Sequence, residues 1–158
     1  MKTISIPLNK RSYPVWVGQG LFKIVTKLLK PMNSGNKWFI VTQDKIKTLY
    51  GDRLLQSLNN SGFNTKIVSI PTGEKAKSLK VFENLHKQLL QIRCDRKSIL
   101  LALGGGVVGD MAGFVASTYM RGSKYIQIPT TLLAMIDSSI GGKTGINLKQ
   151  GKNLIGDY

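Results

Sequence analysis

Three glycines with the spacing of a phosphate-binding loop, Gly104, Gly106 and Gly109, come directly after an apolar run that ends at Leu103. Glycine lets the backbone turn sharply and approach a diphosphate without a Cβ in the way. A helix beginning beyond the loop adds free N–H groups and the positive end of its dipole. The motif therefore predicts nucleotide binding, although the same glycines also suit a close-packed turn between a strand and a helix.

A standard dinucleotide fold places an acidic residue about 20 positions further on, where it holds the adenosine ribose. Here that region reads Gln127-Ile128-Pro129-Thr130, without a carboxylate. Asp44 is the better candidate because it follows an expected strand at Trp38–Thr42, and open α/β sheets bind ligands at the carboxyl ends of their strands. A plain two-half Rossmann dehydrogenase is therefore not expected.

Two further polar clusters carry possible chemistry. Pro71-Thr72-Gly73-Glu74-Lys75-Ala76-Lys77-Ser78 offers a carboxylate for a ribose and a lysine for a phosphate, but an ordinary turn with a capping serine explains it equally well. The segment from Asp137 to Asn153 contains Gly142-Lys143-Thr144, yet a P-loop needs glycine at position 137, so a Walker A site is rejected. Its lysines, asparagines and aspartate suit an anionic, polyhydroxylated small molecule.

Hydrophobic periodicity predicts the elements that position these residues. Strands are expected at Thr3–Leu8, Tyr13–Val17, Trp38–Val41, Lys66–Ile70, Ser98–Leu103 and Tyr125–Ile128, with a turn at Asn9-Lys10. Helices are expected at Leu21–Leu29, at Ile46–Leu58 with Leu49, Tyr50, Leu54 and Leu58 on one side, after the cap Ser78 with Leu79, Phe82, Leu85 and Leu89 inward, and at Val107–Met120 and Thr131–Ile136. The pattern predicts an α/β fold: a Rossmann-like open, mostly parallel sheet flanked by helices, with an N-terminal β-hairpin.

Composition restricts the class of protein. A chain of 158 residues with 42% hydrophobic residues suits one domain, residues 1–158. One Cys excludes a disulfide framework, and no apolar run is long enough to cross a bilayer, so we expect a cytoplasmic protein with no membrane partner. The net charge is +15, but 18 of the 23 basic side chains are spread through residues 1–99 without forming a block, so we expect no nucleic-acid partner.

Several motifs together resemble those of the 3-dehydroquinate synthase family, in order and spacing. They are Gly104-Gly105-Gly106-Val107-Val108-Gly109-Asp110, Thr118-Tyr119-Met120-Arg121-Gly122, Ile128-Pro129-Thr130-Thr131-Leu132-Leu133-Ala134, Asp137-Ser138-Ser139-Ile140-Gly141-Gly142-Lys143-Thr144-Gly145, Asn147 and Gly151-Lys152-Asn153. The resemblance is strong over residues 38–158, and residues 1–37 agree in pattern only. One departure is Asn-Leu-Lys-Gln at 147–150, where the family commonly has Asn-His-Pro.

The resemblance implies a lyase of the shikimate pathway, the route to aromatic amino acids, which uses NAD to convert 3-deoxy-D-arabino-heptulosonate 7-phosphate to 3-dehydroquinate and phosphate. It implies that NAD is held by Asp44, Thr72, Gly73, Glu74, Lys75, Ala76, Lys77, Gly106, Val107, Val108, Gly109, Asp110, Thr130, Thr131, Lys143 and Lys152. It implies that the sugar phosphate substrate meets Arg121, Asp137, Lys143, Lys152 and Asn153. The resemblance also implies a homodimer.

The family's catalytic divalent metal, zinc or cobalt, is held by one Glu and two His of a helical second domain. This sequence reaches Tyr158 before any of them, so we expect no metal site, an N-terminal NAD-binding domain and no turnover by this chain alone. His86 is expected to be a surface or boundary residue and Cys94 a bystander. Another sugar phosphate cyclase of the same superfamily and a non-catalytic nucleotide-binding module remain as alternatives.

Overall fold

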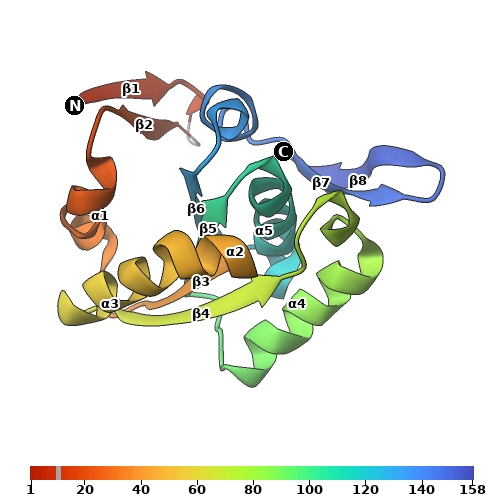
Figure 1. Cartoon of the computed structure of the whole chain (residues 1–158), viewed down its shortest axis with the longest axis horizontal. Coiled ribbons are helices and arrows are strands. Elements are labelled where there is room, and N and C mark those ends of the chain that lie inside the picture. Colours follow the sequence, from red (N-terminus) through yellow and green to blue (C-terminus); the bar gives the residue numbers. More distant parts are fainter. Residues whose placement is uncertain (10–11) are drawn as a thin grey trace. The chain divides into compact units, whose positions relative to one another are not determined.

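The computed structural model describes residues 1–9 and 12–158, which form two compact units, residues 1–34 and residues 35–158 (Figure 1). In the first unit, β1 (Lys2–Ile6) pairs antiparallel with β2 (Tyr13–Val17), and α1 (Leu21–Leu29) and the short turn η2 (Lys30–Met32) follow. The expected hairpin and helix are confirmed, whereas Lys10 of the expected turn lies outside the described residues.

The second unit carries the parallel sheet and its helices. Its elements are β3 (Lys37–Gln43), α2 (Asp44–Ile46), η3 (Lys47–Gly51), α3 (Asp52–Asn60), β4 (Asn64–Ile70), η4 (Glu74–Ala76), α4 (Leu79–Gln91), β5 (Ile99–Gly104), α5 (Gly106–Thr118), η5 (Tyr119–Arg121), β6 (Lys124–Pro129), η6 (Ala134–Ser138), β7 (Thr144–Leu148) and β8 (Gly151–Asp157). The alternation of strand and helix agrees with the pattern expected from the sequence.

The strand order β4-β3-β5-β6 contains a switch point. From β3 the chain first crosses to β4 on one side and then returns to β5 on the other, and all three pairings are parallel. Helices on both sides of a switch point leave a crevice at the carboxyl ends of the strands that flank it. In this sheet those strands are β3 and β5, so Asp44 and the glycine loop stand at the expected place for a ligand.

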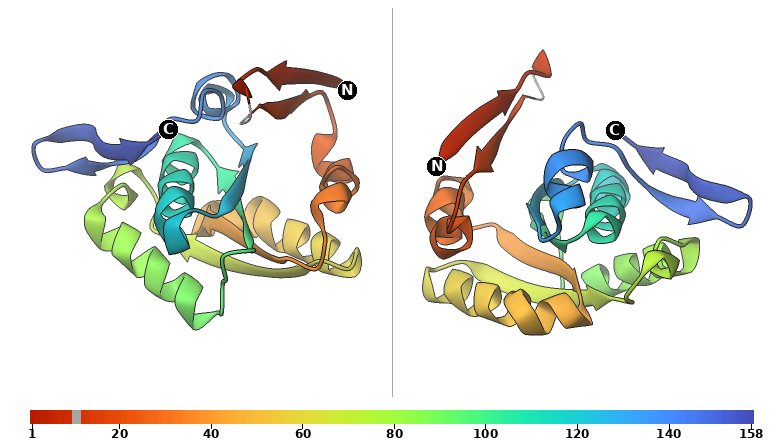
Figure 2. Two further views of the ribbon diagram at one scale, coloured as in Figure 1. Left: turned by 180° about the vertical axis from the view of Figure 1, so that it is seen from behind. Right: turned by 45° about the horizontal axis from the view of Figure 1, so that its top comes forward.

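Both faces of the sheet are covered by helices (Figure 2). Phe39 of β3 and Leu100 of β5 belong to a buried cluster with α4 and α5. Side chains alternate along a strand, so Trp38 faces the opposite side, where its ring meets Phe63 edge-on at 5.1 Å between centroids. Every residue of β5 is buried, which confirms the strand expected to be covered on both faces.

Two expectations about inward residues are wrong. Leu49 and Tyr50 are 56% and 44% exposed, while Leu54 and Leu58 of the same segment are buried. Leu49 and Tyr50 lie within η3, a π-helical turn, and its extra residue changes the angular position of their side chains relative to those of Leu54 and Leu58 in α3. Leu79 is 52% exposed because it is the first residue of α4.

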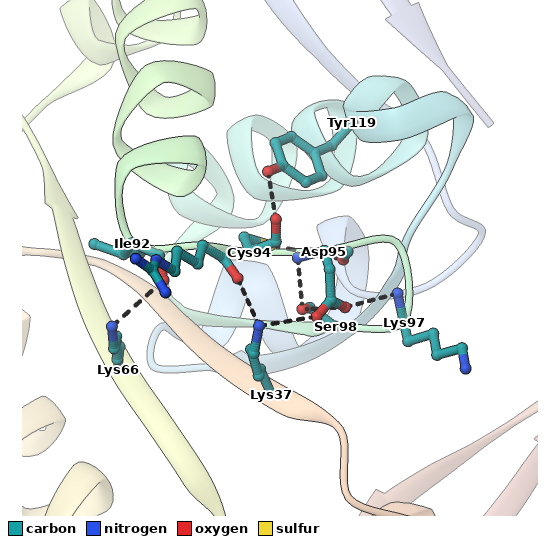
Figure 3. A network of polar contacts seen from close by, with 9 residues as sticks. Lys37, Lys66, Ile92, Cys94, Asp95, Lys97, Ser98 and Tyr119 are labelled. Carbon is teal, nitrogen blue, oxygen red and sulfur yellow. Dashed lines mark hydrogen bonds and ion pairs between the residues drawn. The ribbon is translucent and has the colours of Figure 1, made fainter.

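A polar network fixes the opposite edge of the sheet, where β3 and β5 begin (Figure 3). Asp95 Oδ1 accepts hydrogen bonds from the Lys97 amide and the Ser98 hydroxyl, and Asp95 Oδ2 lies 3.1 Å from Lys37 Nζ. The Tyr119 hydroxyl donates to the Cys94 carbonyl at 2.9 Å. These contacts join the turn before β5 to β3 and to the end of α5, at a distance from the glycine loop.

Candidate functional site

Four of the predicted cofactor segments follow strands of the parallel sheet. Asp44 follows β3, Thr72–Lys77 follow β4, the glycine loop follows β5 and Thr130 follows β6. Three hydrogen bonds tie these strand ends together: Thr42 Oγ1 to Leu103 O at 2.8 Å, Gln43 Nε2 to Pro71 O at 3.0 Å and Thr130 N to Gly104 O at 2.9 Å. The sheet therefore brings four separate sequence motifs to one edge.

The glycine loop allows another segment to close over the start of α5. A Cβ on Gly105 would lie 3.2 Å from the Thr131 side chain, and one on Gly106 would lie 3.3 Å from Ser138 Oγ. A Cβ on Gly109 would come 2.5 Å from Gln127 Oε1. Close packing therefore accounts for the glycines at positions 105, 106 and 109. It is compatible with ligand binding, because the packed segment brings hydroxyl groups to a helix N-terminus.

Two of those hydroxyl groups have buried oxygens without a hydrogen-bond partner. Thr130 Oγ1 and Ser138 Oγ are both in this state, and a buried hydroxyl without a partner is unfavourable. The first N–H groups of α5 also lack intrahelical acceptors, as at any helix N-terminus. This set of hydroxyl and amide donors fits the phosphates of a dinucleotide.

Lys77 forms the centre of a second cluster, which we call the Lys77 clasp and which consists of Glu74, Lys77, Asp110, Asn147 and Asn153. Lys77 is 5% exposed, and its Nζ lies 2.5 Å from Asp110 Oδ2 and 2.5 Å from Asn153 Oδ1. The clasp therefore joins the loop after β4, the first turns of α5 and strand β8. Lys77 is buried and links Asp110 to Asn153 by hydrogen bonds. The sequence analysis instead suggested a lysine that contacts a phosphate.

Asn147 is the member of the clasp that sequence reasoning did not assign to the site. Its Nδ2 donates to Glu74 Oε1 at 2.8 Å, and its Oδ1 accepts from the Asn153 amide at 2.9 Å. The backbone N–H of Asn147 donates to the backbone carbonyl of Lys77 at 2.9 Å. The available signal was its position within the quoted motifs, because nothing in the local pattern shows that one side chain bridges two segments.

Burial and the charge of Lys77 have opposite effects on the pKa of the Asp110 carboxyl. Burial raises the pKa of the Asp110 carboxyl, the ion pair with Lys77 lowers it, and the negative charges of Glu74 and Asp137 raise it, with a net upward direction. The distance of 2.5 Å to Lys77 shows a direct pair, so we interpret Asp110 as a carboxylate kept charged by Lys77 at a desolvated position. These interactions also place Glu74 and Asp137 within electrostatic reach of Asp110.

The remaining predicted residues differ in how closely they join this region. Asp137 lies in η6, whose end is held by a hydrogen bond from Gln127 Nε2 to Ser138 O at 3.1 Å. Lys152 is exposed and directly precedes Asn153 on β8, and Lys143 is exposed just before β7. The segment from Thr144 to Asp157 is an antiparallel hairpin, a feature that the sequence analysis missed.

Arg121 does not join the cluster within this chain. It follows α5, a helix of 13 residues that begins at the glycine loop, so about 20 Å of helix separates the two. Its own φ is 68° and that of Met120 is 49°, both in the left-handed region. The structure therefore places Arg121 at the amino edge of the sheet, beside the start of β6.

A groove borders the outer side of the Lys77 clasp, with a volume of about 470 Å³. Its lining adds two lysines that the sequence analysis did not single out, Lys80 and Lys149, to Glu74, Lys75 and Lys77. Elsewhere, His86 is half-buried and bonded to Phe82 O and Thr118 Oγ1, and Cys94 is buried. Among the residues that the structure describes, no group of three or more His, Cys, Asp or Glu is placed to hold a metal ion.

The switch point, the glycine loop and the donors gathered around it define a Rossmann-like α/β domain of the nucleotide-binding type. Comparison with known proteins then gives the family. The model for the N-terminal part of 3-dehydroquinate synthase matches residues 67–158, so the chain belongs to the 3-dehydroquinate synthase family.

Curated relatives agree along the whole chain. The 3-dehydroquinate synthase of Syntrophotalea carbinolica is 45% identical over 158 residues, covering 100% of this chain and 44% of the relative. That of Hydrogenovibrio crunogenus is 46% identical and is covered to 43%. The chain thus spans less than half the length of these relatives, and it resembles their first part.

Solved structures give the same fold. A 2-deoxy-scyllo-inosose synthase complexed with carbaglucose-6-phosphate, NAD+ and Co2+ has a TM-score of 0.90 at 26% identity, with 99% of this chain and 42% of that one covered. A 2-epi-5-epi-valiolone synthase from Streptomyces hygroscopicus with NAD+ and Zn2+ bound has a TM-score of 0.80 at 31% identity, with 97% and 42% covered. The expected fold class is confirmed.

Proposed function

We propose that this chain is the NAD-binding part of a 3-dehydroquinate synthase. The complete enzyme converts 3-deoxy-D-arabino-heptulosonate 7-phosphate to 3-dehydroquinate and phosphate. The observation that carries the proposal is the meeting of Asp44, the glycine loop, Thr130 and the Lys77 clasp at one edge of the sheet, in a chain of this family. The proposed setting is the cytoplasm, and the described residues contain no helix long and apolar enough to cross a membrane.

In this proposal each motif has its own task. Asp44 binds the adenosine ribose, and the first turn of α5 with Thr130 and Thr131 binds the diphosphate. The other proposed NAD contacts are Thr72, Gly73, Glu74, Lys75, Ala76, Lys77, Val107, Val108, Gly109, Asp110, Lys143 and Lys152. Bound NAD supplies the means to oxidise a substrate alcohol and to reduce it back. The oxidised substrate carries a ketone, which acidifies the neighbouring C–H and permits elimination of phosphate.

Charged side chains position the substrate. Lys143 and Lys152 offer ammonium groups to its carboxylate and phosphate, and Asp137 and Asn153 offer hydrogen-bond partners for hydroxyl groups. Lys77 keeps Asn153 and Asp110 fixed relative to each other. The divalent metal does not fit the described residues, since they provide no cluster of ligands for it. We therefore assign no step of metal chemistry to this chain.

A homodimer forms part of the proposal because of Arg121. If this residue meets the substrate, it must do so in another copy of the chain, since α5 separates it from the glycine loop by about 20 Å. Met120 and Arg121 are exposed at the edge of the sheet opposite the glycine loop of the same chain. A neighbouring copy of the chain has access to them there.

A second candidate is another sugar phosphate cyclase. It is supported by the TM-score of 0.90 to a 2-deoxy-scyllo-inosose synthase, although the curated relatives of 45% identity are 3-dehydroquinate synthases. The two candidate enzymes are distinguished by the sugar phosphate from which they release phosphate. This chain joined to the C-terminal region of a relative should release phosphate from the heptulosonate phosphate and not from glucose 6-phosphate.

The first test is a calorimetric titration of NAD into this chain. We expect saturable binding that weakens at least tenfold in Asp110→Ala, because this change removes the ion pair with Lys77 that joins the loop after β4 to α5. Glu83→Ala is the matched control: Glu83 is an exposed acid on α4 paired with Lys87, and its loss should leave affinity unchanged. Equal affinity in all three proteins would refute the proposed site.

A DNA titration completes the experiment. Retention of duplex DNA with a steep dependence on salt would instead indicate that the charge of +15 serves nucleic-acid binding. A chain that binds NAD but stays inactive after completion with a second domain would be a nucleotide-binding module.

A further inference from the structure

The hairpin formed by β7 and β8 has an irregularity at Asn147. The register of the two strands shifts between Ile146 and Leu148, which places Asn147 at the shift. On β8 the chain adapts through Asn153, whose φ of 54° lies in the left-handed region. Irregularities of this kind often lie next to active sites, where they redirect a side chain. The direction that Asn147 takes is therefore of functional interest.

The side-chain amide of Asn147 is held at both ends. Its Oδ1 accepts the backbone N–H of Asn153 at 2.9 Å, and its Nδ2 donates to Glu74 Oε1 at 2.8 Å. An amide carries its acceptor and its donor on opposite sides of one planar group. The bond to Asn153 therefore directs the donor of Asn147 toward the Glu74 carboxylate.

Neither Glu74 nor the hairpin needs this bond for its own stability. Glu74 is exposed, so water would satisfy its carboxylate, and holding a long side chain in one conformation costs entropy. The hairpin is already attached, because the backbone N–H of Asn147 donates to Lys77 O at 2.9 Å and Lys77 Nζ lies 2.5 Å from Asn153 Oδ1. The fixed orientation of the Glu74 carboxylate therefore requires another explanation.

We infer that Asn147 is a positioning residue, which holds the Glu74 carboxylate in the orientation that accepts a hydrogen bond from a ribose hydroxyl of NAD. This inference rests on the proposed function, in which Glu74 is an NAD contact. The bond to Asn147 uses Oε1 of Glu74 and leaves Oε2 for the ligand. The same amide supports the backbone of Asn153, a proposed substrate contact, so Asn147 links the cofactor side of the site to the substrate side.

A double-mutant cycle tests the inference by calorimetric titration of NAD into the unsubstituted chain, Glu74→Gln, Asn147→Asp and the double variant. Asn147→Asp keeps the acceptor for Asn153 and replaces the donor with a carboxylate that repels Glu74. We expect each single variant to bind NAD at least about fivefold more weakly, because a hydrogen bond to a charged group is lost or misdirected. The double variant should bind no more weakly than Glu74→Gln, because Asn147 acts through Glu74.

Thermal unfolding of the same four proteins separates positioning from support of the fold. In the double variant the amide and the carboxylate exchange places, so the hydrogen bond re-forms with opposite polarity and the net charge is that of the unsubstituted chain. Its Tm should return to that of the unsubstituted chain, while its affinity for NAD stays low. A loss of affinity caused by destabilisation alone would recover together with the Tm.

Two further variants control for charge. Gln150→Glu adds the same negative charge on the exposed turn of the same hairpin, and it should leave the affinity for NAD unchanged. Asn147→Ala removes the donor without adding a charge, and it should weaken NAD binding as Asn147→Asp does. An equal loss in Gln150→Glu would show an effect of charge alone and would overturn the inference.

The remaining outcomes are equally decisive. Unchanged affinity in either single variant of the cycle would overturn the positioning role, and so would losses that multiply in the double variant, because Asn147 would then act independently of Glu74. Recovery of affinity together with the Tm would overturn it as well. An unsubstituted chain that binds no NAD would instead overturn the proposed function, and this inference with it. NAD binding that is insensitive to Asn147→Asp would leave the proposed function standing.

Discussion

Tyr119 is held un-ionised by its surroundings. Its side chain is 2% exposed, its hydroxyl donates to Cys94 O, and burial, with smaller contributions from Cys94 and Asp95, raises its pKa from 10.0 to about 12. In the unfolded chain the same phenol loses its proton near pH 10. Between about pH 10 and pH 12 the unfolded state therefore binds fewer protons than the folded state, and the free energy of unfolding falls as pH rises.

Tyr119→Phe should remove this part of the alkaline sensitivity. At neutral pH the variant should be less stable by about 1–2 kcal/mol, because the buried Cys94 carbonyl loses its donor. Urea denaturation at a series of pH values measures both effects, and tyrosinate absorbance should lose its latest-titrating component. Tyr158→Phe is the control, since Tyr158 is 78% exposed. A variant with the same alkaline slope as the wild type would contradict this account.

At the scale of elements, α5 is packed through a row of small residues. Gly109 faces Gln127, and Gly113 faces Thr144 of β7 so closely that a Cβ would overlap the Thr144 side chain. The helix can therefore lie directly against β6 and the hairpin. This contact, together with the Lys77 clasp, holds the hairpin that carries Lys152 and Asn153.

Gly113→Ala should destabilise the chain by about 1–3 kcal/mol, because the cost of overpacking exceeds the gain in helix propensity. Thr144→Ser removes the nearest methyl group and keeps the hydroxyl that donates to Asp157 O. The double variant should therefore recover most of the lost stability. A double-mutant cycle by urea denaturation measures the coupling, and additive effects would show that the two residues do not press on each other.

The elements that could be predicted are those set by local periodicity. The apolar run at Ile99–Leu103 and the helix after Ser78 are examples, and the cap is confirmed by the bond from Val81 N to Ser78 Oγ. The hairpin at Thr144–Asp157 could not be predicted, because its place depends on contacts with α5 and Lys77. The turn that displaces Leu49 depends on how its helix meets the sheet.

The site could be predicted to the level of its segments and no further. Loops that follow parallel strands share an edge, so Asp44 and the glycine loop could be brought together on topology alone. The partners of Lys77 could not, since Asp110 and Asn153 are 33 and 76 positions away in the sequence. A buried lysine between them is a property of the tertiary structure.

At the scale of the whole molecule, the second unit carries the proposed cofactor site, and its described residues include no cluster of metal ligands. The purified 158-residue chain should therefore release no phosphate from the heptulosonate phosphate, because its described residues offer no metal ligands to hold an ion that polarises the reacting hydroxyl. A phosphate assay with added zinc or cobalt checks this, and the positive control is this chain joined after Tyr158 to the C-terminal region of the Syntrophotalea carbinolica relative. Turnover by the short chain would show that the described residues are sufficient for catalysis.

The contact between Gly113 and Thr144 also constrains how this family can change over time. A substitution that enlarges position 113 requires a smaller side chain at position 144. Natural variation at this pair of positions should therefore be correlated, with large residues at both positions excluded. The record of this packing should be visible in a collection of sequences even where no structure has been determined.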